Sequence, residues 1–184
     1  METITVITPA ATPESPEDAK SLVLRMLEES ESREKICAEK ICAGIKAVGL
    51  AAKDLHYRAK GEAFYSEHLL ADLAGKVESL TDDFIEVYYM GDKGWNPPLM
   101  GSIYCMANSW LVEKNVPPEC EDPTGECTTT EYWARRLLRV CEDLVANVEI
   151  AKDTLTKKSG TQAVLDEISK EVLQVIGLLK RNLK

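Results

Sequence analysis

The only two histidines of this 184-residue chain, His56 and His68, lie at the two ends of one segment, HYRAKGEAFYSEH. Asp72 follows His68 by four residues, so on a helix these two side chains share one face. Imidazole nitrogen and carboxylate oxygen are the ligands expected of a non-haem iron site or a similar divalent-metal site. The spacing therefore makes His56, His68 and Asp72 candidate metal ligands.

Further acidic residues lie downstream, at Asp82, Asp83 and Glu86. Asp82 and Glu86 are again four residues apart, which places them on one face of a helix. A lone histidine near a helix end is usually only hydrogen-bonded, and acidic residues on a helix usually form a solvated face. Residue type and spacing alone therefore leave a metal site and a plain solvated surface both open.

Apolar periodicity predicts the helices that must position these side chains. SPED (15–18) is a typical helix start, with Ser15 as N-cap and Pro16 at the first helical position. The polar run at 28–35 is either a solvated helical turn or a break, and we favour a break or kink. Beyond it, apolar residues recur in steps of four and three, which is the pattern of a packed helix. They are Cys37, Ile41, Gly44, Val48, Ala51 and Leu55.

A second helix is expected from about residue 62 to residue 90, with Gly91 beyond its end. Its apolar positions include Leu69, Leu73, Val77, Leu80, Phe84 and Val87. A turn region over 91–102 then leads into a short helix that ends near residue 115. The sequence TTTE (128–131) predicts a capping box at the start of the next helix, with Thr128 as cap.

Two more helices complete the chain. The first has apolar positions Leu137, Cys141, Leu144, Val148, Ala151 and Leu155, and the second has Leu165, Ile168, Val172, Val175 and Leu179. SGT (159–161) separates them. No strand pattern is present. We therefore expect an all-α fold: residues 15–184 form a four-helix bundle with a short helix in the connection between the second and third long helices, as in ferritin-like proteins, and residues 1–14 form a flexible tail.

Composition narrows the function. The net charge is −9, and no Lys or Arg occurs before Lys20, which argues against tight DNA binding because binding requires cationic side chains to replace phosphate counterions. No apolar run reaches the roughly 18 residues of a membrane helix. The N-terminus lacks a basic segment followed by an apolar one, so we expect no secretory signal and a cytoplasmic protein.

Six cysteines are present. Cys37, Cys42, Cys105 and Cys141 fall in apolar-periodic stretches, where cysteine behaves as a small hydrophobic residue. Cys120 and Cys127 lie in the proline-rich stretch before the third long helix, and their spacing is not a standard zinc spacing. A reducing compartment favours unligated thiols, with a disulfide or a metal pair as the alternative.

The segment 56–72 resembles the signature of the Dps family, the ferritin-like "DNA-binding protein from starved cells" group. That family has His-Trp, two residues, Lys-Gly, two residues, Phe, three residues, His. The corresponding residues are His56, Tyr57, Lys60, Gly61, Phe64 and His68. Asp72 stands where the family has its ligand Asp, and PLMGS (98–102) is similar to the start of the family's short middle helix. Tyr57 replaces the family's Trp, and we expect it to pack at an interface, with hydrogen bonding to a ligand or electron transfer as the alternative.

The resemblance implies a homo-oligomer, a hollow twelve-subunit shell with ferroxidase sites at two-fold interfaces. His56, His68 and Asp72 would come from one subunit, and Asp82 and Glu86 would come from its partner. Such sites bind Fe²⁺, oxidise it with hydrogen peroxide or oxygen and feed a ferric core, which protects against oxidative stress. The implied function is an iron-storing ferroxidase whose ligands would also accept Mn²⁺ or Zn²⁺.

The second pair of ligands has two alignments. In the family the later Asp and Glu follow the second His by fifteen and nineteen residues, whereas Asp82 and Glu86 follow His68 by fourteen and eighteen. A one-residue deletion after Asp72, which the apolar pattern favours, restores the pair. An ungapped alignment selects Asp83 and lacks the Glu. That alternative favours a rival hypothesis, a ferritin-like structural or partner-binding protein without ferroxidase activity.

Overall fold

The computed structural model describes residues 16–58, 64–113, 130–155 and 157–183, and these residues form helices and short connections without strands. The helices are α1 (Pro16–Arg58), α2 (Phe64–Val77), α3 (Leu80–Phe84), the π-helix η2 (Ile85–Lys93), α4 (Met100–Glu113), α5 (Thr130–Thr154) and α6 (Ser159–Asn182). The expectation of an all-α chain is confirmed for this part of the sequence. The expected tail (1–14), the Ser15 and Thr128 caps, and Cys120 and Cys127 lie outside the described residues.

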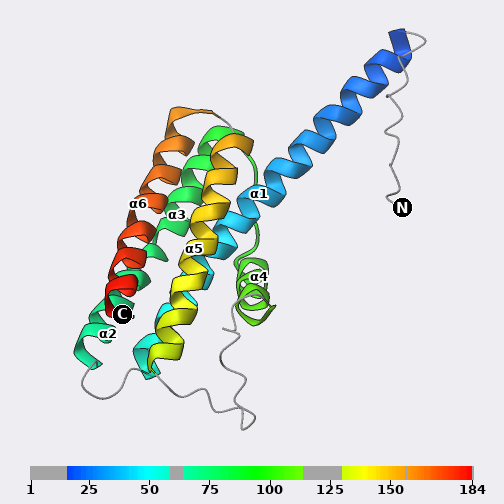
Figure 1. Ribbon diagram of the computed structural model, residues 1–184. Helices are drawn as coiled ribbons and strands as arrows, with labels where there is room; N and C mark the ends of the chain where they lie inside the picture. The colour runs from blue at the N-terminus through cyan, green and yellow to red at the C-terminus, as the bar shows by residue number, and fades with distance from the viewer. Residues whose placement is uncertain (1–15, 59–63, 114–129, 156, 184) are drawn as a thin grey trace, which may run out of the picture.

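Four helical segments surround one apolar core (Figure 1). The C-terminal half of α1 packs against α2 and α5, α5 packs against α6, and α6 returns to α2, α3 and η2. The helix periodicities predicted for α1, α5 and α6 are confirmed, because every position predicted to be apolar in these three helices is buried. Helix α4 packs against α1 and adds Ile103, Ala107 and Leu111 to the same core.

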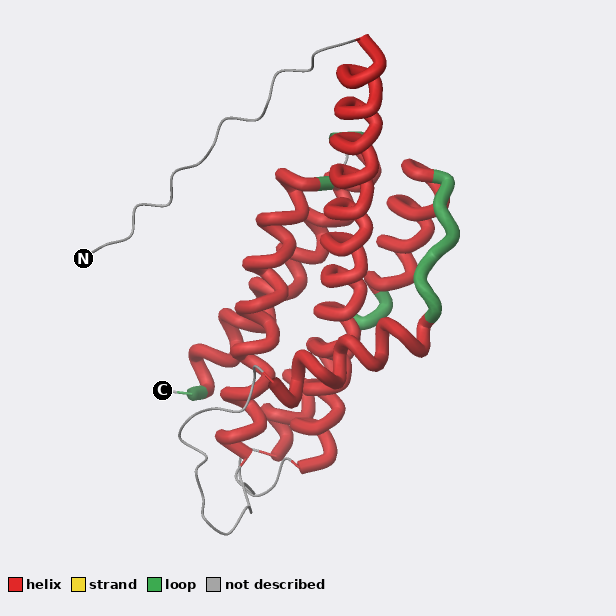
Figure 2. The backbone as a smooth tube through the Cα atoms, turned by 90° about the vertical axis from the view of Figure 1, so that its right-hand side faces the viewer, coloured by secondary structure: helices red, strands yellow, loops and turns green. Residues whose placement is uncertain are grey.

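Helix α1 is continuous, so the break predicted at 28–35 is wrong. The polar run contains no Gly or Pro, and ion pairs one turn apart support it, Arg33 with Glu29 at 4.0 Å and Lys35 with Glu31 at 2.6 Å. The N-terminal half of α1 projects beyond the other helices (Figures 1 and 2). Its apolar side chains are exposed, namely Leu22, Val23, Leu24, Met26 and Leu27.

The second long helix differs from the prediction of one helix over 62–90. It is interrupted by a turn at Glu78–Ser79, and after α3 it continues as the π-helix η2 to Lys93. Gly94, with φ 64°, ends it in the left-handed conformation that favours glycine, so the predicted end at Gly91 is also wrong. Leu69 is exposed, and Leu70 is buried in its place.

The π-helix buries two successive tyrosines, Tyr88 and Tyr89. The Tyr88 hydroxyl donates to Glu34 of α1 at 3.2 Å, and the two tyrosine rings meet edge-to-face with centroids 5.3 Å apart. Lys93 also pairs with Glu34. These contacts attach the end of the second helical stretch to α1, and the wider π turn allows neighbouring side chains to enter the core together.

Candidate functional site

His56 and His68 meet where α1 ends and α2 begins. His56 lies in the last turn of α1 and His68 in the second turn of α2. Their ring centroids are 3.6 Å apart, and the ring planes are inclined by 33°. The sequence spacing across the helix–helix corner therefore brings the two imidazoles of the chain into direct contact.

Asp72 joins this pair. Its Oδ1 lies 3.2 Å from Nδ1 of His56, and the two side chains are 56% and 31% exposed. Asp72 thus lies beside His56, and the three predicted residues are neighbours on a partly exposed surface.

Residues of α5 fix the end of α1 that holds His56. The guanidinium of Arg58 lies 4.4 Å from the ring centroid of Trp133, and that of Arg136 lies 5.3 Å from it. Arg136 also pairs with Asp54 at 3.0 Å, two residues before His56. These positioning contacts were not predicted from the sequence, because no local pattern links α1 to residues of α5.

Tyr57 is exposed within the single chain. Its side chain is 79% exposed, and its ring meets that of His56 edge-to-face with centroids 5.3 Å apart. The residue thus stands on the open side of the histidine pair. Its packing at a subunit interface stays a prediction.

Asp82, Asp83 and Glu86 lie beyond the turn at Glu78–Ser79, on α3 and η2. All three are exposed, and in the described part of the chain they make no ion pair with the histidines. Within the described ranges, no group of three or more His, Cys, Asp or Glu side chains is arranged to hold a metal ion. One chain therefore makes His56, His68 and Asp72 neighbours without arranging them as a metal site, and it keeps the later carboxylates apart from them.

The interruption at Glu78–Ser79 lies between the two sets of candidate ligands. One residue more or less on a regular helix rotates all later positions by about 100°. Here the helix is not regular between Asp72 and Asp82, and η2 changes the winding again at Glu86. A residue count alone therefore does not fix which of Asp82 and Asp83 shares a face with Glu86.

Glu78 holds this interruption in place. Its carboxylate accepts from Lys46 at 3.4 Å, from Lys53 at 3.0 Å and from the Tyr104 hydroxyl at 3.3 Å. Burial by itself raises the pKa of Glu78, but the hydrogen bond from Lys53 and the charges of both lysines outweigh it and hold the pKa below its usual range. Gly49 makes room for the carboxylate, since an added Cβ would lie 2.8 Å from Oε2.

The cysteines divide by burial. Cys37, Cys42 and Cys141 are buried as predicted, and burial raises the pKa of each thiol, for Cys42 to about 12. Cys105 is exposed, so its prediction as a buried hydrophobic residue is wrong. Helix α4 buries Ile103, Ala107 and Leu111 instead, and a residue two positions after Ile103 lies about 200° around the helix.

Comparisons with models of known protein families, with curated proteins and with solved structures return no match. Among the described helices, none combines the length and apolar character needed to cross a membrane.

Proposed function

We propose that the chain is a Dps-like mini-ferritin, a ferritin-like four-helix bundle that oxidises Fe²⁺ and stores ferric iron in a hollow homo-oligomeric shell. The proximity of His56, His68 and Asp72 at one corner is the observation that carries the proposal, because two imidazoles and a carboxylate are three of the five ligands in the proposed ferroxidase set. The ring of helical segments with α4 outside it is in keeping with that architecture.

The remaining ligands would come from a second subunit. Asp82 and Glu86 are exposed on α3 and η2, where they are accessible to another chain. In the proposed two-fold contact, the partner's Asp82 and the partner's Glu86 face His56, His68 and Asp72. A site divided in this way is incomplete in one chain, so Fe²⁺ oxidation would require assembly.

The chemistry follows from the donor set. Carboxylates stabilise iron increasingly as its charge rises from 2+ to 3+, whereas neutral imidazoles hold the metal without adding charge. Five side-chain ligands from two chains leave open positions for hydrogen peroxide or oxygen, which accepts the electrons. Fe²⁺ is the substrate, and few ligands let the Fe³⁺ product move on to the core. Mn²⁺ or Zn²⁺ would compete for the same donors.

The test is Fe²⁺ oxidation followed by absorbance. We expect the double substitution His56→Ala and His68→Ala to abolish most of the rate, Asp82→Asn to reduce it strongly, and Asp83→Asn to leave it near the wild-type value. Asp83→Asn is the matched control, since it removes an exposed neighbouring carboxylate. Equal rates for wild type and the double variant would refute the proposal, and the opposite order of the two Asp variants would select the ungapped alignment.

Assembly is the second test. Light scattering should give a particle of about twelve times the 20.4 kDa chain mass. We expect this particle to sit in the cytoplasm and not to bind DNA tightly at about 150 mM salt, because the net charge of −9 opposes phosphate contacts. A clear gel shift at that salt concentration would contradict the last point.

A second candidate is a helical structural or partner-binding protein without ferroxidase activity. The exposed apolar residues of the projecting half of α1, with Met26 and Leu27 each 61% exposed, favour it, because such exposed clusters mark interaction surfaces. A purified protein that is a metal-free monomer or dimer would support this candidate over the ferroxidase.

A further inference from the structure

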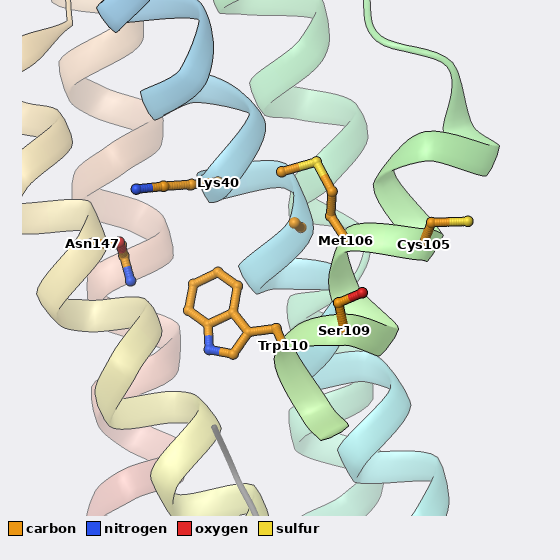
Figure 3. Close-up of a pocket in the computed structure, with 7 residues that line it drawn as sticks. Lys40, Cys105, Met106, Ser109, Trp110 and Asn147 are labelled. Carbon is orange, nitrogen blue, oxygen red and sulfur yellow. The ribbon is translucent and has the colours of Figure 1, made fainter. Parts of the chain in front are cut away.

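A cavity of about 360 Å³ opens between α1, α4 and α5, away from the histidine corner (Figure 3). Ala43, Met106 and Trp110 give it an apolar wall, and Lys40 and Asn147 stand at its rim. Small-molecule sites typically have roughly 300–1,000 Å³ of space, apolar walls and a few placed polar groups. The cavity therefore has the size and composition of a site for a small ligand.

Trp110 is fixed before any ligand arrives. Its Nε1 donates to Oδ2 of Asp143 on α5 at 3.4 Å. The far edge of its ring lies over Gly44 of α1, where an added Cβ would be 3.3 Å from both Cη2 and Cζ3. A glycine at this position lets the indole approach the helix closely. The ring is thereby held between three helices and presents a flat apolar surface to the cavity.

Two polar side chains at the rim of the cavity, Lys40 and Asn147, can form hydrogen bonds or an ion pair with a ligand. Among the described residues, Lys40 has neither a hydrogen bond nor an ion pair in the structure, and its side chain is exposed. Asn147 uses its Nδ2 to donate to the Asp143 carbonyl oxygen at 2.7 Å, which leaves its Oδ1 as an acceptor. Figure 3 shows Lys40, from α1, and Asn147, from α5, on the same side of the Trp110 ring. A cation, an acceptor and an aromatic face thus converge on one space.

We propose that this cavity binds a small aromatic monocarboxylate. The ligand ring lies on Trp110 and Met106, the carboxylate pairs with Lys40, and Oδ1 of Asn147 accepts from a hydroxyl or N–H on the ring. The Asp143 carboxylate beside the indole selects against a second negative charge. This inference uses residues of α1, α4 and α5 only and does not depend on the proposed iron site.

The test is calorimetric titration of the wild-type protein with 2-naphthoate and with its neutral analogue 2-naphthamide. We expect 2-naphthoate to bind about fivefold more tightly than 2-naphthamide, which is the upper end for one partly exposed ion pair. Lys40→Gln should remove this difference and leave 2-naphthamide binding unchanged. Trp110→Leu should weaken both ligands.

The matched control is Lys157→Gln, an exposed lysine beyond the end of α5, which should bind both probes as wild type does. Lys40 is exposed, so its substitution does not threaten folding, and circular dichroism checks Trp110→Leu. Absence of 2-naphthoate binding at millimolar concentration would overturn the proposal. This holds even if binding fails because another subunit occupies the cavity. An equal loss of both probes in Lys40→Gln would overturn the assigned carboxylate contact.

Discussion

Glu78→Gln should destabilise the chain far more than the loss of an ordinary surface ion pair. Glu78 bridges Lys46 and Lys53, and the Lys46 side chain is only 8% exposed while that of Glu78 is 17% exposed. Glutamine keeps the size of the side chain and one acceptor oxygen, but it removes the charge. The buried ammonium of Lys46 is then left without a counter-ion.

The expected magnitude follows from the burial of the two partners. Removing one partner of a fully buried pair costs about 3–5 kcal/mol. Because the carboxylate is partly exposed and the amide oxygen can still accept, we expect about 2 kcal/mol from Lys46. The exposed Lys53 adds about 0–1 kcal/mol. The free energy of unfolding should therefore fall by about 2–3 kcal/mol.

The assay is urea denaturation at pH 7, followed by far-ultraviolet circular dichroism. The control is Glu142→Gln, which breaks an exposed pair with Lys180 at 2.6 Å and should cost at most about 1 kcal/mol. In a double-mutant cycle, Lys46→Met should cost less in the Glu78→Gln background than in wild type. The reasoning is refuted if Glu78→Gln destabilises no more than Glu142→Gln, or if the cycle gives no coupling.

Glu78 also lies between the candidate ligands on α2 and those on α3 and η2. Under the proposed function, loosening the turn changes how the two sets are placed on one subunit. Glu78→Gln should then slow Fe²⁺ oxidation although Glu78 is not itself a ligand. An assembled, folded variant with an unchanged oxidation rate would show that the turn serves stability alone.

Three further predictions test other features of the structure. The pKa of Glu78 is lowered, so the contribution of its carboxylate to stability is complete above the ordinary carboxyl pKa of about 4.3. This contribution is lost as pH falls through the lowered pKa. Urea titrations should therefore show that the difference in free energy of unfolding between wild type and Glu78→Gln becomes smaller in acid. The Tyr89 hydroxyl is buried without a hydrogen-bond partner among the described residues, so Tyr89→Phe should raise the free energy of unfolding by about 1 kcal/mol. The Tyr88 hydroxyl donates to Glu34, so Tyr88→Phe should lower the free energy of unfolding by about 1 kcal/mol. Urea denaturation of both variants measures these changes, and changes of the same sign would contradict the prediction. Iodoacetamide at pH 8 should modify Cys105 rapidly and Cys42 only on unfolding, because Cys105 is exposed and Cys42 is buried. Peptide mass spectrometry measures both reactions. Modification of both thiols at the same rate in the native protein would refute the burial of Cys42.

The buried faces of the helices could be predicted from the sequence because the spacing of apolar residues along a helix is a local property. Steps of four and three place Ile41, Val48, Leu144 and Val172 on the inner faces of their helices, and all four are buried. The same reasoning brought His56, His68 and Asp72 together, since residues four apart on one helix and residues at a helix corner must be neighbours. The sequence by itself therefore determined the helical class, three of the buried faces and the first half of the candidate site.

The interruption of the second helix had no local signal. Glu78–Ser79 reads as ordinary helical surface, and the turn depends on lysines 32 and 25 residues earlier in the chain. The π-helix likewise depends on Glu34, which lies 54 residues before Tyr88. Conversely, the charged run at 28–35 suggested a break that its own ion pairs prevent.

Only the tertiary structure decided how the chemical groups face one another. It brought Asp72 to within 3.2 Å of Nδ1 of His56 and kept Asp82 and Glu86 apart from the histidines. It also placed Trp110 over Gly44 in a cavity with the exposed Lys40 at its rim. The reason is physical: periodicity in a sequence records which face of a helix avoids water, whereas the orientation of a side chain is set by contacts with residues far away along the chain.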